Sequence, residues 1–187
     1  MAGLTDIERH EPALSRDAAG INVGTRNRVP MAELRVKLTE AGFFDVATVL
    51  QSGNVILTSS DESPGRVEAA VERLLAAEFG VDVRCVTRSA ATVRALLGDD
   101  PLAGIATDPS RHLVYFLSDE PAKAAVRGLM QGDHSPEVLD IRGTEAHVWT
   151  PEGVKAMKLS NPYLEKRLGV VATARNWNTI KKIVAKL

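Results

Sequence analysis

Cysteine is almost missing from this sequence of 187 residues, in which Cys85 is the single example. A lone cysteine cannot form an internal disulfide bond, and such sparing use of cysteine is typical of a reducing compartment. It also cannot complete a zinc site with the four histidines His10, His112, His134 and His147, because these do not stand at metal-binding spacings from one another. The sequence therefore predicts no metal site and no cofactor, and we expect Cys85 to be a buried, inert thiol.

Aromatic residues and long apolar runs are also scarce. Aromatic side chains make up 4% of the chain and hydrophobic residues 44%, so the core must consist mostly of Val, Leu, Ile and Ala. The longest apolar runs are far too short to cross a bilayer. The first residues, MAGLTDIERHEPALSRD, carry charges throughout and contain no apolar segment of the secretory kind. We therefore expect a folded cytoplasmic protein with no membrane partner.

The charge is close to balanced overall but unevenly distributed. The net charge is −1, yet residues 150–187 contain 8 of the 23 basic residues and 2 of the 24 acidic ones. This segment therefore carries +6 and the remainder −7, and such polarity can steer an anionic partner toward the C-terminal end. A solvated, lysine-bearing helix face explains the same pattern, and it is the favoured interpretation of the two.

The first half of the chain alternates helical and strand patterns. Pro30 suits the first position of a helix, and the polar segment 51–54 is typical of a turn between two strands. The predicted elements are a helix over 30–41, strands over 46–50 and 55–58, a helix that begins at Ser63-Pro64 and ends before Gly80, and a strand over 81–85. If a further strand precedes Gly20, the order is βαββαβ, the ferredoxin-like plan.

The second half echoes this recurrence without a sequence repeat of fixed period. The predicted elements are a helix over 89–97, a buried strand over 113–117, a helix that opens at 119–121 with Ala122 facing inward, a hairpin of strands 137–141 and 146–150, and a helix over 173–187. Thr173 would cap the last helix, which places Arg175 and Asn176 in its first turn. A basic residue there opposes the helix dipole, and a neighbouring carboxylate or a bound anion would resolve the conflict.

Four short segments carry a resemblance to a known family. They are GINVG (20–24), SGN (52–54), KL (158–159) and TARNWNT (173–179), with VPMAELR after the first and LEKRLG before the last. In this order and at these intervals, from Gly20 to Leu187, the chain resembles the bacterial domain of unknown function 1697 family. The resemblance implies an α+β protein in two parts, ferredoxin-like in its first half, and it implies no established activity.

Two departures from the family pattern bear on the fold and the site. The stretch 13–19 is polar, and Ala19 stands where the family usually has arginine, so we expect the first strand to be short, displaced or replaced by an irregular arm. Met157 stands where the family usually has a serine before Lys158. The fold class that follows is α+β, with a ferredoxin-like half over 1–88 and a second, smaller α+β unit with C-terminal helices over 89–187.

The candidate ligand site gathers the polar residues of these motifs. The segment GINVGTRNRVP matches neither nucleotide-binding fingerprint of glycine spacing, so a strand-to-helix turn is the first interpretation and a phosphate cradle the second. Arg175 and Asn176 offer donors and an acceptor for a ligand, or they bond the SGN turn and hold the halves together. The predicted ligand-binding residues are Asn22, Gly24, Arg26, Arg28, Ser52, Asn54, Lys158, Arg175 and Asn176.

Three functions remain open on this sequence. The leading hypothesis is a non-catalytic binding protein for an anionic ligand, a nucleotide or a nucleic-acid backbone. The first alternative is an enzyme on a small phosphorylated or carboxylated substrate, with Lys158 and Arg175 as charge clamps, although the sequence shows no general base. The second is a structural or oligomerisation module, a homodimer among the possible assemblies, in which the polar motifs serve as internal hydrogen bonds.

Overall fold

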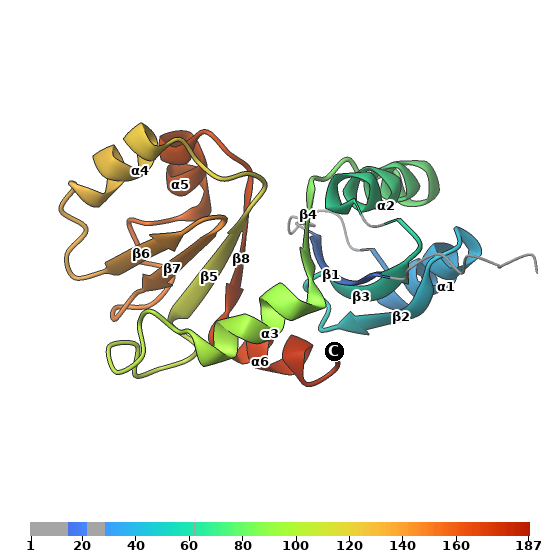
Figure 1. Cartoon of the computed structure of the whole chain (residues 1–187), viewed down its shortest axis with the longest axis horizontal. Helices are drawn as coiled ribbons and strands as arrows, with labels where there is room; N and C mark the ends of the chain where they lie inside the picture. Colours follow the sequence, from blue (N-terminus) through green and yellow to red (C-terminus); the bar gives the residue numbers. More distant parts are fainter. Residues whose placement is uncertain (1–14, 22–28, 62) are drawn as a thin grey trace, which may run out of the picture.

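Two four-stranded antiparallel sheets organise the chain, whose computed structural model describes residues 15–21, 29–61 and 63–187. The first sheet and its helices comprise β1 (Ser15–Ile21), α1 (Met31–Glu40), β2 (Phe44–Val49), β3 (Asn54–Ser59), α2 (Pro64–Phe79), β4 (Cys85–Ser89) and α3 (Ala90–Gly98). The second comprise β5 (His112–Leu117), α4 (Lys123–Met130), β6 (Val138–Arg142), β7 (Glu145–Trp149), α5 (Asn161–Leu168), β8 (Ala172–Asn176) and α6 (Trp177–Val184). Figure 1 shows the two sheets on either side of α3 and α6.

The same plan occurs twice in the order of elements. The strand orders are β2-β3-β1-β4 and β6-β7-β5-β8, and every neighbouring pair is antiparallel. One further helix follows the last strand of each sheet along the chain, α3 after β4 and α6 after β8. The elements of both sheets therefore occur in the order βαββαβα. We call β1 through α3 the first unit and β5 through α6 the second unit. The mixed α+β class is confirmed, and the predicted domain boundary after residue 88 stays a prediction.

Alternation along the strands sends side chains to two different cores. In β3, Val55 and Leu57 pack with leucines of α1 and α2, whereas Ile56 between them faces the opposite side of the sheet. In β5, Leu113, Tyr115 and Leu117 pack with α4 and α5, whereas Val114 and Phe116 face away. Successive strand residues point to opposite faces, so each sheet carries its own helices on one face and offers an apolar second face.

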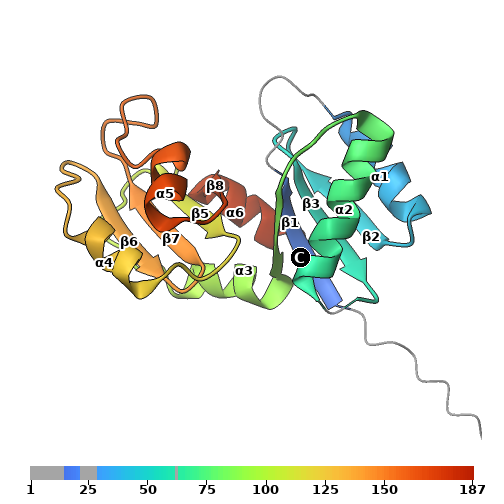
Figure 2. The same cartoon turned by 90° about the horizontal axis from the view of Figure 1, so that it is seen from above.

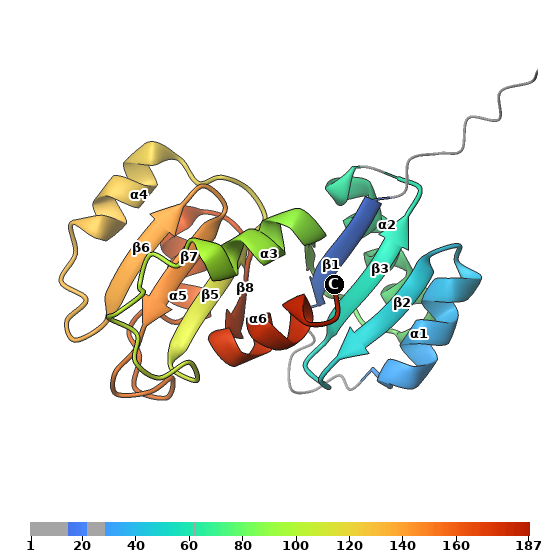
Figure 3. The same cartoon turned by 60° about the horizontal axis from the view of Figure 1, so that its bottom comes forward.

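The two second faces meet in one shared cluster, which we call the seam. Helices α3 and α6 pack against each other between the sheets, as Figures 2 and 3 show from two further directions. The seam consists of Val49, Ile56, Val86, Val93, Leu96, Val114, Phe116, Trp177, Ile180 and Ile183. Both units contribute to it, so burial of this apolar surface stabilises their association as well as each unit.

Most predicted elements are observed within a few residues of their expected ends, and one end of the chain needs correction. Residues 172–176 form a strand that pairs with β5, so the predicted helix over 173–187 begins only at Trp177. Backbone pairing to β5 outweighs the helical pattern in these residues, and the cap moves from Thr173 to Asn176. Arg175 therefore lies in a strand, and the predicted conflict with a helix dipole does not arise.

Three smaller differences concern single elements. Val81 donates its N–H to the Leu75 carbonyl as part of the end of α2, and β4 begins only at Cys85 rather than at 81. Ala122 is exposed, because α4 starts at Lys123. A first strand is present over 15–21 in spite of its polar sequence, paired between β3 and β4.

In the described part of the chain, no helix combines the length and apolar character that a membrane crossing requires.

Candidate functional site

An arginine occupies the same position in the last strand of each unit. Arg88 and Arg175 both precede the residue that caps the following helix, in the related segments RSAATV (88–93) and RNWNTI (175–180). Ser89 accepts the N–H of Thr92, and Asn176 accepts the N–H of Thr179. The side chains of both arginines cross the seam to the hairpin turn of the other unit, which makes the contact reciprocal.

Arg175 reaches the SGN turn (52–54), which connects β2 and β3. Its Nε donates to the Oδ1 of Asn54, and its Nη2 lies 3.5 Å from the Ser52 carbonyl oxygen. Its Nη1 donates to the Thr173 hydroxyl at 2.9 Å and to the Ala174 carbonyl at 2.7 Å. The side chain is buried, and desolvation lowers the pKa of its guanidinium to about 10. Arg175 is thus an internal contact between the units, as one of the two predictions for it stated.

Arg88 makes the corresponding contact in the opposite direction. Its Nε donates to Glu145 Oε1 at 2.7 Å, and its Nη2 donates to the carbonyls of Leu117 at 2.6 Å and Thr144 at 3.0 Å. The guanidinium also lies 5.6 Å from the centre of the Phe116 ring. Glu145 is the first residue of β7, as Asn54 is the first residue of β3. A carboxylate therefore faces Arg88 where a neutral amide faces Arg175.

The contact of Arg175 with Asn54 fixes the direction of a hydrogen-bond relay. A guanidinium can only donate, so Asn54 must present its Oδ1 to Arg175 and turn its Nδ2 the other way. That Nδ2 donates to the Val49 carbonyl at 2.8 Å and to the Ser52 hydroxyl oxygen at 3.1 Å. Because the Ser52 oxygen accepts here, this bond leaves the hydroxyl hydrogen unused, and Ser52 is exposed to solvent.

The remaining predicted site residues are only partly brought together. Gly20, the first residue of GINVG, pairs with Asn54 across β1 and β3, so that motif begins beside the SGN turn. Asn176 is half-buried, and its Oδ1 accepts from both the N–H and the hydroxyl of Thr179, so its role here is a helix cap. Asn22, Gly24, Arg26 and Arg28 lie outside the described residues.

Lys158 lies in the second unit, in the connection between β7 and α5. Its Nζ donates to the Ser135 carbonyl at 2.8 Å, and its side chain is exposed. The backbone N–H groups of Lys158 and Leu159 both donate to the buried carboxylate of Glu137. These contacts fold the KL motif against the second unit, and none of them is shared with Arg175.

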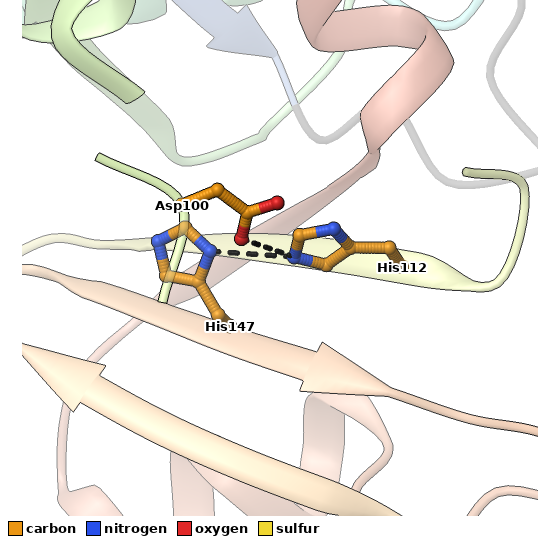
Figure 4. Close-up of side chains that lie close together, drawn as sticks. All are labelled: Asp100, His112 and His147. Carbon is orange, nitrogen blue, oxygen red and sulfur yellow. Dashed lines mark hydrogen bonds and ion pairs between the residues drawn. The ribbon is translucent and has the colours of Figure 1, made fainter. Parts of the chain in front are cut away.

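Sequence reasoning missed a cluster of two histidines and an aspartate. Antiparallel pairing sets Val114 opposite His147, and His112 is two residues before Val114, so the imidazoles are diagonal neighbours on one face of the sheet. His112 Nε2 lies 3.4 Å from His147 Nδ1 and 3.8 Å from Asp100 Oδ1 (Figure 4). The histidines are 35 positions apart, so only the pairing of β5 with β7 could have revealed them.

Burial disfavours the protonated form of both imidazoles. Burial lowers the pKa of His112, and burial followed by the nearby His112 lowers the pKa of His147 to about 4. The Trp177 ring stacks on His112 with the ring centres 4.5 Å apart. The Asp100 carboxylate is held by the N–H of Leu102 at 2.9 Å. Neutral imidazoles with ordered rings are the form that ligates metals.

Cys85 carries no comparable chemistry. Its thiol is buried in the first core, and desolvation, reinforced by the carboxylates of Glu72 and Glu68, raises its pKa to about 12. The thiolate is the reactive form of cysteine, and burial with acidic neighbours disfavours it. Within the described residues, the features that remain for function are the relay that ends at Ser52 and the Asp100–His112–His147 cluster.

Comparison with known proteins places the chain in a family without an assigned activity. Its fold matches the conserved bacterial protein SP0830 from Streptococcus pneumoniae with a TM-score of 0.70 and 27% identity, over 93% of this chain and 99% of that one. No curated protein matches the sequence. The family described as "Protein of unknown function (DUF1697)" matches residues 19–147. The chain therefore belongs to the DUF1697 family.

Proposed function

We propose that this protein is a non-catalytic binding protein that takes an anionic ligand at the SGN turn. The observation that carries the proposal is the direction of the relay from Arg175 through Asn54 to Ser52. Each group in this series donates to the next, and it ends in an exposed hydroxyl whose hydrogen is available to a ligand. Hydrogen bonds in series polarise one another, and a cation at the start strengthens the last donor.

Charge near the turn favours an anion over a neutral acceptor. The buried guanidinium of Arg175 projects positive charge through a medium of low dielectric constant, where electrostatic interactions weaken slowly with distance. Lys181 and Lys182 are exposed on α6, the helix that follows the Arg175 strand. A phosphate group suits a hydroxyl donor in this setting, which makes a nucleotide or a nucleic-acid backbone the expected ligand class.

The test is a titration of the full-length protein at low salt. The ligands are inorganic phosphate, a nucleoside triphosphate and a single-stranded oligonucleotide. Calorimetry measures the binding of each one. We expect salt-sensitive binding of at least one of them. Ser52→Ala should weaken it about 10- to 150-fold, because a hydrogen bond to a charged group contributes about 1.5–3 kcal/mol.

Ser60→Ala is the matched control, since Ser60 is an exposed serine of the same unit outside the relay. Its affinity should equal that of the unmodified protein. The proposal fails if none of the three ligands binds. It also fails if Ser52→Ala and Ser60→Ala bind equally well.

A structural role is the second candidate, because Arg175 is buried in contacts between the units. On that reading, Asn54→Ala lowers the free energy of unfolding while Ser52→Ala changes neither stability nor ligand binding. The enzyme alternative required Lys158 and Arg175 to act as paired clamps. Their described contacts lead to Ser135 and to the SGN turn respectively, so they do not favour that function.

A further inference from the structure

The Asp100–His112–His147 cluster is independent of the SGN turn. It is built from three separate parts of the second half: the connection from α3 to β5, the start of β5 and the middle of β7. His112 and His147 are each 1% exposed, whereas the Asp100 side chain is 17% exposed. Two buried imidazoles thus lie beside a carboxylate that solvent reaches.

We propose that Asp100, His112 and His147 bind a divalent transition-metal ion of the zinc class. The three candidate ligand atoms all lie within 4.8 Å of one another, and two of the separations are 3.4 Å and 3.8 Å. Two ligands of a tetrahedral zinc ion, each about 2.1 Å from the metal, lie roughly 3.4 Å apart. The histidine pair already has this separation, and Asp100 needs to approach His112 by about 0.4 Å and His147 by no more than about 1.4 Å, which a side-chain rotation on a loop provides.

The ligand types select the metal. Two imidazoles and one carboxylate suit Zn²⁺, Co²⁺ and Ni²⁺, whereas Mg²⁺ and Ca²⁺ prefer sites made of oxygen atoms. Three protein ligands leave one tetrahedral position for water, on the side where Asp100 is exposed.

Neighbouring groups hold the ligands in place, as the surroundings of metal sites do. Trp177 stacks on the His112 ring, and the Leu102 N–H holds the Asp100 carboxylate. The competing interpretation is a direct hydrogen bond between the two rings, in which His112 Nε2 and His147 Nδ1 share one proton. In the metal-bound form the ion replaces that proton, so the two interpretations differ in whether added metal is taken up.

The test uses the full-length protein after dialysis against a chelator. Zn²⁺ is titrated by calorimetry, and Co²⁺ is added separately so that its visible absorption reports the coordination geometry. We expect one saturable Zn²⁺ site per chain and an intense tetrahedral Co²⁺ band. Zinc should also raise the melting temperature, because a ligand that binds the folded state stabilises it.

Asp100→Asn is the main variant, because asparagine retains an oxygen for the Leu102 N–H while it removes the charge. His147→Gln is the second, and both should weaken Zn²⁺ binding at least tenfold. The matched controls are Asp108→Asn and His134→Gln, an exposed aspartate and a histidine bonded to the Leu129 carbonyl outside the cluster. If His147→Gln does not fold, the Zn²⁺ affinity of Asp100→Asn alone tests the proposal.

The proposal is overturned if the unmodified protein takes up no Zn²⁺. It is also overturned if the cluster variants bind Zn²⁺ as tightly as the controls. Ser52→Ala should leave Zn²⁺ binding unchanged, so the result is independent of the function proposed for the SGN turn.

Discussion

Arg88 and Arg175 hold the same position in the two units, yet they meet different partners across the seam. Arg88 forms an ion pair with Glu145, whose side chain is 14% exposed. Arg175 donates to the amide of Asn54, to backbone carbonyls and to a hydroxyl. The first contact joins two opposite charges, whereas the described acceptors of Arg175 are all neutral oxygens. The two arginines share the same position. The first residue of the partner strand, Glu145 in β7 or Asn54 in β3, determines whether the contact pairs two charges or joins a charge to a neutral amide.

This difference predicts that removing Arg88 and removing Arg175 lower the free energy of unfolding by unequal amounts. A buried ion pair that loses one partner leaves an uncompensated charge, whereas a lost donor to neutral oxygens leaves a smaller desolvation penalty. Three sets of substitutions measure this comparison, in order of expected effect.

Arg88→Met should have the largest effect. The variant removes the guanidinium that donates to the Glu145 carboxylate and to the carbonyls of Leu117 and Thr144. Glu145 then keeps the Thr144 hydroxyl as a donor but loses its counter-charge, and we expect a loss of about 3–5 kcal/mol in the free energy of unfolding. Urea denaturation followed by circular dichroism measures it. Adding Glu145→Gln to this variant should recover part of the loss, because the stranded charge is removed. A double variant no more stable than the single one would show that the charge of Glu145 is not the cause.

Arg175→Met should cost less, about 1–3 kcal/mol, because its described acceptors are neutral oxygens. The same denaturation experiment applies. Asn54→Ala is the matched change on the other side of the contact, and its effect should not add fully to that of Arg175→Met. A cost for Arg175→Met above that of Arg88→Met would reverse the comparison.

The two helix caps should show the smallest effects. Ser89→Ala and Asn176→Ala each remove one acceptor from a helix N-terminus, and each should cost about 1 kcal/mol. Asn176→Ala should cost about as much as Ser89→Ala, because each cap oxygen also lies within hydrogen-bond distance of the threonine hydroxyl three residues on. Thermal unfolding of the two variants side by side tests this equality. Equal melting temperatures for both variants and the unmodified protein would mean that the caps contribute nothing.

Much of the fold could be predicted from periodicity and turn chemistry. The helix after Pro30, the helix between Ser63 and Gly80, and the strands of the central hairpins follow local rules, and the structure has them near the expected residues. The first strand and β8 could not be predicted in this way, because both are specified by pairing with distant strands rather than by their own residues. Local propensity is a weak guide where neighbouring strands supply the hydrogen bonds.

The candidate site was predictable where a motif marks it and unpredictable elsewhere. The SGN turn and Arg175 were expected to meet, and their contact is observed. Arg88 belongs to none of the predicted sites, although the similarity of RSAATV to RNWNTI indicates that it is the counterpart of Arg175. The histidine cluster depends on strand register and on a loop aspartate, neither of which leaves a local signal.

The reciprocal arrangement of the seam has a consequence for how the two ends of the molecule can specialise. In a symmetric dimer of identical subunits, both ends of an isologous interface have the same residues, so a change at one end is repeated at the other. Here two similar halves are covalently joined, and each end can vary alone. Glutamate at one hairpin and asparagine at the other are such independent choices. One end can thus be specialised for cohesion while its counterpart is free for recognition.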